Sequence, residues 1–298
     1  MPDLISRVAR LQIDTLLIEF GGGAGLDIEF EALRTATPEA NTARVAVYNL
    51  SPQHRKAITD AAAKTSPSVR LEAGYRDACV VVFDGDFDLV NVTRRGPDVV
   101  TELTLRDGAK TMATAALVRA YKARTQLSTV LKDLAEATSL GLGNLSDVVA
   151  EAQISGVGRT LAAPFALNGN AYQALQRLAA AAGLEVSVQG KRLQFVAIGG
   201  ALKTRAVVLS PTSGLVGSPA VAVQRKHALP GQTVVTPGRA AGSVLKAKCL
   251  IMPGLDPGQQ IQVKAENVDG AYTIRRTHYI GETAGTQWYA DLEAVPVV

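Results

Sequence analysis

Residues 277–294 read THYIGETAGTQWYADLEA, and this stretch near the end of the chain decides the fold. Apolar and polar side chains alternate on both sides of the turn sequence ETAG, which predicts two antiparallel strands. The stretch also holds His278, one of three histidines, and Trp288, the only tryptophan. It is therefore either an active site, with His278 and a carboxylate as an acid–base pair, or the last strand pair of a β domain.

The length and amino-acid composition fit a globular protein rather than a disordered one. The chain has 298 residues, 47% hydrophobic and 19% charged, which corresponds to roughly two to three domains. The net charge is +4, and a nucleic-acid binder usually concentrates its basic residues in a run or stripe. Here the basic residues come singly or in pairs, such as Arg94-Arg95, Lys191-Arg192 and Arg275-Arg276. We expect these pairs at strand ends, facing water.

The two cysteines indicate a reducing compartment. Cys79 and Cys249 are far apart in the sequence, each in an apolar run, which suits buried free thiols better than a disulfide or a metal site. The N-terminus has no apolar core of signal-peptide length, and no segment reaches the apolar length of a membrane span. We therefore expect a protein that is made in a cytoplasm and does not insert into a membrane.

Changes in hydrophobic periodicity divide the chain into a β region (1–110), an α/β insert (111–204) and a second β region (205–298). In the first region, LQIDTLLIEF (11–20) predicts a strand that ends at the turn GGGAG (21–25). A short helix follows later, with Ser51 as its N-cap and Pro52 at its first position. The pattern predicts an α+β fold, mainly β, with antiparallel strands that form small barrels or sandwiches.

The insert predicts two helices and a hairpin. The first helix presents one apolar face and stops at Gly141, and the second starts at Asn170 and stops at Gly183. The sequence LEVSVQGKRLQFVA (184–197) then predicts a hairpin around QGK. The apolar faces consist of Leu127, Val130, Leu131 and Leu134 in the first helix and of Tyr172, Leu175, Leu178 and Ala179 in the second.

No catalytic or metal-binding pattern emerges from the candidate residues. The run GGGAG lacks the Gly-Lys-Ser/Thr of a phosphate loop and is followed by an alternating strand. His54, His227 and His278 share no local motif, and DGDFD (84–88) lacks the glycine and the distal glutamate of a calcium loop. We therefore predict no catalytic residue, no cofactor-binding residue and no metal ligand, and hence no enzyme.

Both β regions resemble the baseplate hub proteins of tailed bacteriophages, the family that includes late-control protein D. ARVAVYNLS (43–51), LEAGY (71–75) and FDGDF (83–87) follow that family's order of strands, and the end of the chain has its Pro-Gly turn, its strand with a histidine and its closing strand with a tryptophan. The matching positions are Asn49, Leu50, Ser51, Ala73, Gly74, Tyr75, Phe83, Gly85 and Asp107. By this resemblance His278 and Trp288 belong to a strand pair and catalyse nothing.

The resemblance implies a structural virion protein. Hubs of this family are homotrimers in which two tail-tube-like β domains per chain alternate around a ring, which joins the tail tube to the tip or spike. The expected partners are a tail tube protein, a spike or tail-tip protein, other baseplate proteins and the tape measure protein, with DNA only in transit during genome ejection. We also expect the arginine pairs to lie outside the channel, and the spike to be a separate protein because the chain ends after ADLEAVPVV.

Two alternatives from other classes remain open. One is a tail enzyme that degrades the cell wall or a protein that binds carbohydrate, for which His278, Glu282 and DGDFD are the only support. The other is a DNA-binding module of the virion, which rests on the mild positive charge alone.

Overall fold

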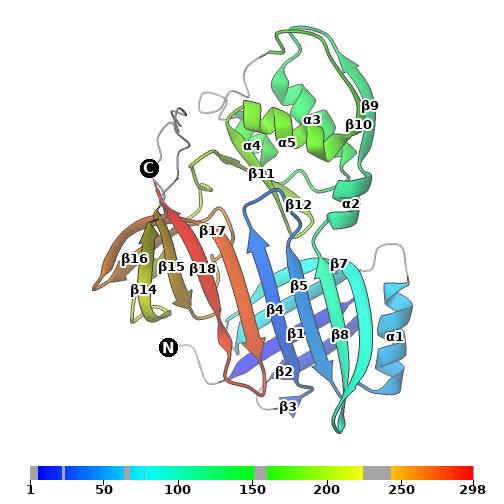
Figure 1. Cartoon of the computed structure of the whole chain (residues 1–298), viewed down its shortest axis with the longest axis vertical. Coiled ribbons are helices and arrows are strands. Elements are labelled where there is room, and N and C mark those ends of the chain that lie inside the picture. Colours follow the sequence, from blue (N-terminus) through cyan, green and yellow to red (C-terminus); the bar gives the residue numbers. More distant parts are fainter. Residues whose placement is uncertain are drawn as a thin grey trace, which may run out of the picture.

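The computed structural model describes residues 6–21, 24–63, 68–76, 78–150, 160–223 and 243–297. Its N-terminal part is a β structure with one helix on its flank (Figure 1). The helix α1 begins as predicted, because the Ser51 side chain accepts a hydrogen bond from the His54 amide and Pro52 is the first helical residue. The elements are β1 (Arg7–Ile13), β2 (Leu16–Gly21), β3 (Ala24–Gly25), β4 (Ile28–Thr35), β5 (Thr42–Tyr48), α1 (Pro52–Ala62), β6 (Ser68–Tyr75), β7 (Ala78–Arg95) and β8 (Asp98–Arg106).

The middle of the chain forms a separate small layer of helices and strand pairs, drawn at the top of Figure 1. The helix α5 starts at the predicted cap, where the Asn170 side chain accepts a hydrogen bond from the Gln173 amide, and it ends just before Gly183. The predicted hairpin is present as β11 and β12. The elements are α2 (Ala109–Thr114), β9 (Ala116–Tyr121), α3 (Leu127–Ala137), α4 (Leu145–Ala150), β10 (Phe165–Asn170), α5 (Ala171–Ala181), β11 (Leu184–Gln189) and β12 (Arg192–Ala197).

The C-terminal part returns to strands and contains the predicted pair around ETAG. His278 lies on β17 and Trp288 begins β18, and the two strands pair antiparallel. The elements are β13 (Val207–Leu209), β14 (Leu215–Val223), β15 (Ser243–Cys249), β16 (Gln260–Ala265), β17 (Val268–Glu282) and β18 (Trp288–Pro296).

One sheet joins the first and the last third of the chain. Its strand order is β14-β15-β18-β17-β4-β5-β8-β7-β6-β1-β2-β3, with β16 and β13 attached to β17. Every pair in this sheet is antiparallel except β13 with β16. The connection between the two β regions is the pair β17–β4, in which Arg276–Glu282 lie opposite Thr35–Glu29.

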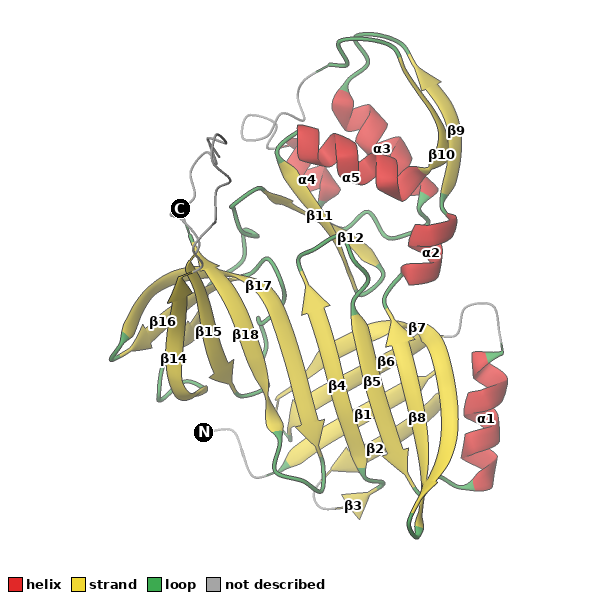
Figure 2. Cartoon of the chain, viewed as in Figure 1, coloured by secondary structure: helices red, strands yellow, loops and turns green. Residues whose placement is uncertain are grey.

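The two β regions repeat one strand order. The first region runs β4-β5-β8-β7-β6 and the second runs β14-β15-β18-β17-β16. In each, one long strand belongs to two layers: β7 pairs with β6 through its first half and with β8 through its second half, and β17 does the same with β16 and β18. Figure 2 shows β4, β5 and β8 in front of β1, β2 and β6, which cross behind them.

The strands β14, β15, β18, β17, β4, β5 and β8 and the second half of β7 form one continuous layer, called the front layer. Apolar side chains fill the space behind it. One buried cluster extends from Ala9 to Ala294 and includes residues of both β regions. A second cluster, from Ala115 to Phe195, belongs to the insert and contains the predicted apolar face of α3. Leu178, predicted on the apolar face of α5, is only partly buried but packs against the same cluster.

Three predictions differ from the structure. LQIDTLLIEF is not one strand, because Asp14 adopts a left-handed backbone (φ 49°) and turns the chain between β1 and β2. The helix α3 ends at Ala137 rather than at Gly141, since Ser139 is left-handed (φ 55°). Barrels were an expected alternative, but the described strands form an open sheet whose path ends at β14 and β3.

Candidate functional site

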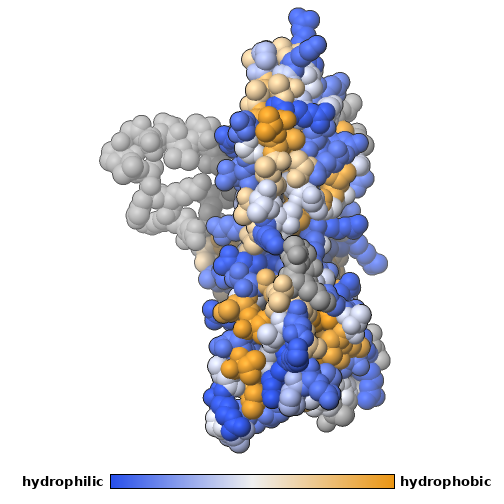
Figure 3. Space-filling model, turned by 90° about the vertical axis from the view of Figure 1, so that its right-hand side faces the viewer, coloured by the Kyte–Doolittle hydropathy of each residue, from blue (hydrophilic) through white to orange (hydrophobic). Residues whose placement is uncertain are grey.

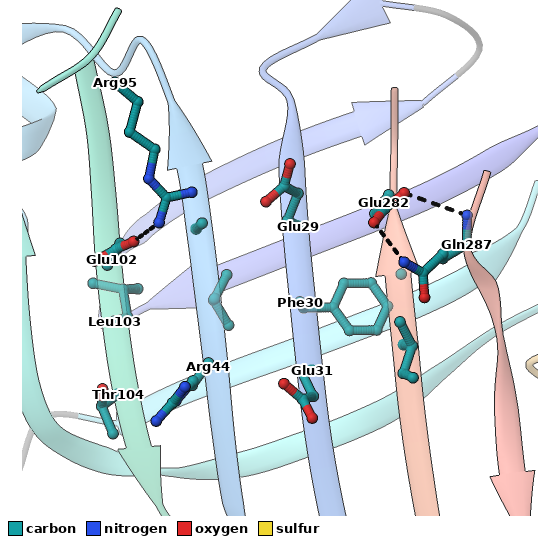
Figure 4. A pocket seen from close by; sticks show the side chains of 14 residues that line it. Glu29, Phe30, Glu31, Arg44, Arg95, Glu102, Leu103, Thr104, Glu282 and Gln287 are labelled. Atoms are coloured by element: carbon teal, nitrogen blue, oxygen red, sulfur yellow. Dashed lines mark hydrogen bonds and ion pairs between the residues drawn. The ribbon is translucent and has the colours of Figure 1, made fainter. Parts of the chain in front are cut away.

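The candidate site is the face of the front layer that points away from the core. Side chains alternate along each strand, so that Ala290, Leu292 and Ala294 of β18 are buried while the residues between them face outward. Two shallow recesses lie on this face, and many of the side chains that line them are charged; Figure 4 shows the recess over β8, β5, β4 and β17. The polar face comprises Lys246, Lys248, Asp291, Glu293, Arg276, His278, Glu282, Glu29, Glu31, Arg44, Glu102 and Arg95.

Charges of both signs alternate across this face. Arg276 lies 3.7 Å from Glu293, Lys248 lies 3.8 Å from Asp291, and each link crosses from one strand to its neighbour. Exposed pairs of this kind add little to stability. Their effect is on the surface potential, because positive and negative groups offset each other within a few ångströms.

His278 pairs with a carboxylate that is distant in the sequence. Its Nε2 lies 2.7 Å from Oε1 of Glu31, across the strand pair β17–β4. Glu282 instead accepts a hydrogen bond from Nε2 of Gln287 at 3.0 Å, as Figure 4 shows. The carboxylate beside His278 is therefore that of Glu31 and not that of Glu282, and His278 links the two β regions.

Aromatic packing secures the joint between β4 and β17 on the core side. The Phe30 ring meets the Trp288 ring edge to face, with centroids 5.4 Å apart. Gly281 lies beside Phe30, and a Cβ atom at this position would overlap the phenyl ring. The indole Nε1 of Trp288 donates to the carbonyl oxygen of Gly74 at 3.1 Å. The only tryptophan is thus a buried contact between the two β regions.

Arg7 holds the turn between β17 and β18. Its guanidinium donates hydrogen bonds to the carbonyl oxygens of Glu282 at 2.8 Å and Gly285 at 2.6 Å. It also lies 5.6 Å from the centroid of the Trp288 ring. These charge-assisted contacts tie the start of β1, the first described strand, to the turn of the last hairpin.

Asp107 fixes the insert to the first β region. Its carboxylate accepts hydrogen bonds from the amides of Gly190 and Lys191, both at 2.7 Å, in the turn of the β11–β12 hairpin. The side-chain amide of Asn41 also donates a hydrogen bond to this hairpin, to the carbonyl oxygen of Val188 at 2.7 Å. Burial raises the pKa of Asp107, and the two amides act against that shift.

Arg34 extends this junction to the second β region. Its guanidinium lies 2.5 Å from Asp256 and its side chain is 12% exposed, while Nε donates to the Gln189 side chain at 3.3 Å. Residues from all three regions line the recess here, including Tyr279. The junction thus connects all three regions of the chain.

The residues that carried the family resemblance have structural roles. Asn49 adopts a left-handed backbone (φ 55°), and its side chain donates to the Asp98 carboxylate and accepts from the Val99 amide at the start of β8. Leu50 and Tyr75 are buried. Gly85 allows the chain to pass the ring of Phe83, which a Cβ atom would contact at 2.7 Å.

The remaining candidate residues are separate from one another. His54 lies on α1, and His227 lies outside the described residues. Asp86 pairs with Lys191 at 2.8 Å and Asp88 with Arg106 at 3.1 Å. Both cysteines are free, and burial raises the pKa of Cys249 to about 12.

The glycine run GGGAG is described only in part. Gly21 ends β2 and Ala24–Gly25 form β3, which pairs back onto β2. Gly22 and Gly23 lie outside the described residues.

Sequence reasoning missed Glu31, Arg34 and Asp256, because their partners are distant in the sequence. Within the described part of the chain no group of three or more His, Cys, Asp or Glu side chains could hold a metal ion. None of the described helices is both long and apolar enough to cross a membrane.

Comparisons with known proteins point to one kind of protein. The model of the family described as baseplate hub gp41 matches residues 15–224, more than half of the chain. No curated protein matches the sequence.

Several solved structures are similar. The prophage MuSo2 43 kDa tail protein from Shewanella oneidensis has a TM-score of 0.65 and 11% identity over 98% of both chains. A tail protein from Neisseria meningitidis has a TM-score of 0.60 and 13% identity over 97% of this chain and 96% of that chain. An Escherichia coli component of the type VI secretion system, described as similar to the T4 bacteriophage tail proteins gp27 and gp5, has a TM-score of 0.57 and 11% identity over 97% of this chain and 77% of that chain. At these identities the likeness is one of fold.

Proposed function

This chain belongs to the baseplate hub gp41 family of bacteriophage tail proteins, and from that premise we propose that it forms a trimeric ring at the tip of the tail. Each chain contributes two tail-tube-like β domains, residues 1–110 and 205–298, and the insert 111–204 lies between them in the sequence. Three chains then present six similar β domains, which adapts a sixfold tail tube to a threefold tip.

The observation that carries this proposal is the β4–β17 pair. It joins two β regions of the same strand order edge to edge, so that one chain supplies a continuous sheet with one polar face. A ring of such chains can be built by continuing the same sheet around an axis, without any additional domain. The aromatic and arginine contacts at the joint favour a fixed angle between the two β regions.

The polar face is the proposed lining of the channel through which DNA passes. DNA moves freely only where the wall lacks uncompensated positive charge. Arg95 and Arg276, one member of each of two arginine pairs, lie on this face, each beside a carboxylate. This proposal replaces the expectation that the arginine pairs stay outside the channel: one arginine of each of these two pairs lines it, beside a carboxylate that offsets its charge.

The remaining elements of the function follow from the hub role. The ring contacts a tail tube protein on one rim and a spike or tail-tip protein on the other, with further baseplate proteins and the tape measure protein as neighbours. The protein is made in the bacterial cytoplasm and resides in the virion. We assign it no enzymatic activity, since the engagement of His278 with Glu31 gives no support to a cell-wall-degrading enzyme.

Native mass spectrometry of the purified full chain tests the ring. We expect a species of three times 31.2 kDa. A chain that stays monomeric at its highest soluble concentration contradicts the self-assembling ring. Retention of duplex DNA that weakens steeply with salt would instead favour a DNA-binding module, and peptidoglycan hydrolysis that is lost in His278→Gln would favour the enzyme.

A further inference from the structure

Positive charge is concentrated at the outer end of the insert. Between Asp107 and Asp133 the chain has five basic residues and no acidic residue, and residues 160–184 also contain no acidic residue. The ribbon of β9 and β10 rises to the upper end of the molecule in Figure 1, and Figure 3, which faces this flank, shows a hydrophilic end above apolar side chains. The five basic residues are Lys110, Arg119, Lys122, Arg124 and Lys132.

Two of these cations have no carboxylate to offset their charge. Arg119 lies 3.3 Å from Asp133, so its charge is partly balanced. Lys122 and Arg124 are exposed, and in the described part of the chain neither forms an ion pair. Both cations are therefore available to a negatively charged partner.

Hydrogen bonds hold both cations on one turn. The amide and the hydroxyl of Thr125 donate to the carbonyl oxygen of Lys122, at 3.2 and 2.8 Å. The Arg124 amide donates to the carbonyl oxygen of Leu161 at 2.8 Å, and the Leu161 amide donates to that of Thr125 at 2.9 Å. Arg124 has a left-handed backbone (φ 67°), which suits glycine better than arginine. The fold of the turn alone thus does not explain an arginine at this position.

An exposed face without charged side chains lies beside this turn. Side chains alternate along β9 and β10, so one face of the ribbon packs on the core of the insert, where Tyr121 and Leu167 are buried. The opposite face points to solvent, and Val118 on it is 78% exposed. The exposed residues of this face are Ala116, Val118, Ala120, Ala166 and Asn168. The outer end of the insert thus has an uncharged centre and a basic rim, as protein–protein interfaces do.

The chemistry of this surface favours a protein partner rich in carboxylates. Insertion into a membrane surface requires large apolar side chains, whereas this face offers one valine among small residues. Single-stranded nucleic acid is bound with exposed aromatic rings, but the Tyr121 ring is buried and stacked on Phe165, with centroids 6.1 Å apart. A duplex-DNA site makes more phosphate contacts than two free cations supply. Carboxylates on a protein surface fit two cations at the rim of an uncharged face.

We propose that the outer end of the insert, defined by Lys122, Arg124 and the exposed face around Val118, is a docking surface for an acidic region of another protein. Carboxylates of the partner pair with the two cations, and its small side chains cover the face around Val118. This surface is additional to the proposed ring, because no part of it belongs to either β region.

Fluorescence anisotropy of labelled poly-L-glutamate, titrated with the full chain, tests this surface. We expect binding that weakens with salt, and a Kd that is about tenfold higher or more in Lys122→Glu/Arg124→Glu. The matched control is Lys264→Glu/Arg205→Glu, which makes the same change of net charge at exposed positions outside the insert. Its Kd should stay within about twofold of the parent value, because salt screens charges that are far from the contact.

Two single variants separate binding from folding. Glycine suits the left-handed backbone at position 124, so Arg124→Gly should keep or raise the Tm while it weakens the binding of poly-L-glutamate. Val118→Asp should weaken binding as well, because it places a carboxylate at the centre of the surface. A Tm that falls in Arg124→Gly, with binding unchanged, would show that this arginine serves the turn and not a partner.

Several results overturn the proposal. Equal loss of binding in the matched control means that net charge alone attracts the polymer, and no binding of poly-L-glutamate at low salt means that carboxylates are not recognised. Tighter binding to duplex DNA or to phosphatidylglycerol vesicles, lost in Lys122→Glu/Arg124→Glu, makes phosphate the ligand instead.

Native mass spectrometry keeps this surface distinct from the ring. The double variant Lys122→Glu/Arg124→Glu should show the same trimer as the parent chain. Loss of the trimer in this variant would make a second copy of the chain the partner and overturn the proposal. A parent chain that binds poly-L-glutamate through these residues but forms no trimer contradicts the proposed ring and supports the docking surface.

Discussion

Phe30 and Trp288 come from the two ends of the sequence, and their rings meet edge to face across the joint of the sheet. Phe30 fits there because Gly281, directly opposite it on β17, has no side chain. This pair sets how closely the first β region approaches the second, and several measurable consequences follow from it and from its surroundings.

Gly281→Ala is expected to lower the free energy of unfolding by about 1–3 kcal/mol, because the added methyl group overlaps the Phe30 ring. Urea denaturation followed by circular dichroism measures the change. Gly270→Ala, on the same strand but with its Cβ at 3.4 Å from Tyr272, is the matched control and should change stability much less. Restoration of stability in Gly281→Ala/Phe30→Leu would identify the overlap as the cause; its absence would refute it.

Arg7→Gln is expected to destabilise the protein by about 1–2 kcal/mol, because hydrogen bonds from a guanidinium to the β17–β18 turn are lost. Trp288 is the only tryptophan, so its fluorescence reports on this site directly and should shift. Arg10→Gln removes an exposed ion pair on the same strand and should cost at most about 0.5 kcal/mol. Equal effects of the two substitutions would show that Arg7 has no special role.

Asp107→Ala is expected to free the turn of the β11–β12 hairpin. Two partly buried amides lose their acceptor, at a cost of about 1–2 kcal/mol. Hydrogen exchange should accelerate at Gly190 and Lys191 before it changes in β4 or β17. In the control, Asp88→Ala breaks an exposed ion pair with Arg106 and should leave those amides protected. Unchanged exchange at the hairpin turn in Asp107→Ala would argue against this anchor.

Cys249 should resist thiol reagents in the folded protein. Burial raises its pKa to about 12, so roughly one thiol in ten thousand is ionised at pH 8. Since only the ionised thiolate reacts, labelling should be slow. Cys79 is half-buried and should react first, with a rate that rises with pH. Mass spectrometry after maleimide labelling distinguishes the two thiols, and unfolding in urea should equalise them. Fast labelling of Cys249 in the native state would mean that the sheet opens between β15 and β18.

The local signals of the sequence predicted local structure well. Ser51, Pro52 and Asn170 marked two helix starts, and the alternation around ETAG gave the strand pair that contains His278 and Trp288. Alternation along a strand reports which side chains share a face, and these elements needed nothing more.

The joint could not be predicted in this way. The contacts of Glu31 with His278 and of Arg34 with Asp256 connect residues that no local pattern relates. Alternation also does not say which strand lies beside which, so neither the β4–β17 pair nor the repeated strand order was visible. Even the turn at Asp14 was hidden, because alternation continues on both sides of it.

The β4–β17 pair has a consequence for errors of assembly. It forms within one polypeptide, so its partners are held at high effective concentration and the pair is complete before any two chains meet. In the proposed ring each chain would therefore enter as a block of two β regions, and a closed ring would contain an even number of these regions. In the proposed ring, one chain too many or too few would change the number of β regions by two. Because the diameter of a closed sheet grows with its strand number, such a ring would differ widely in diameter from the proteins it adjoins. The presence of two β regions in one chain thus restricts the ring sizes that can form.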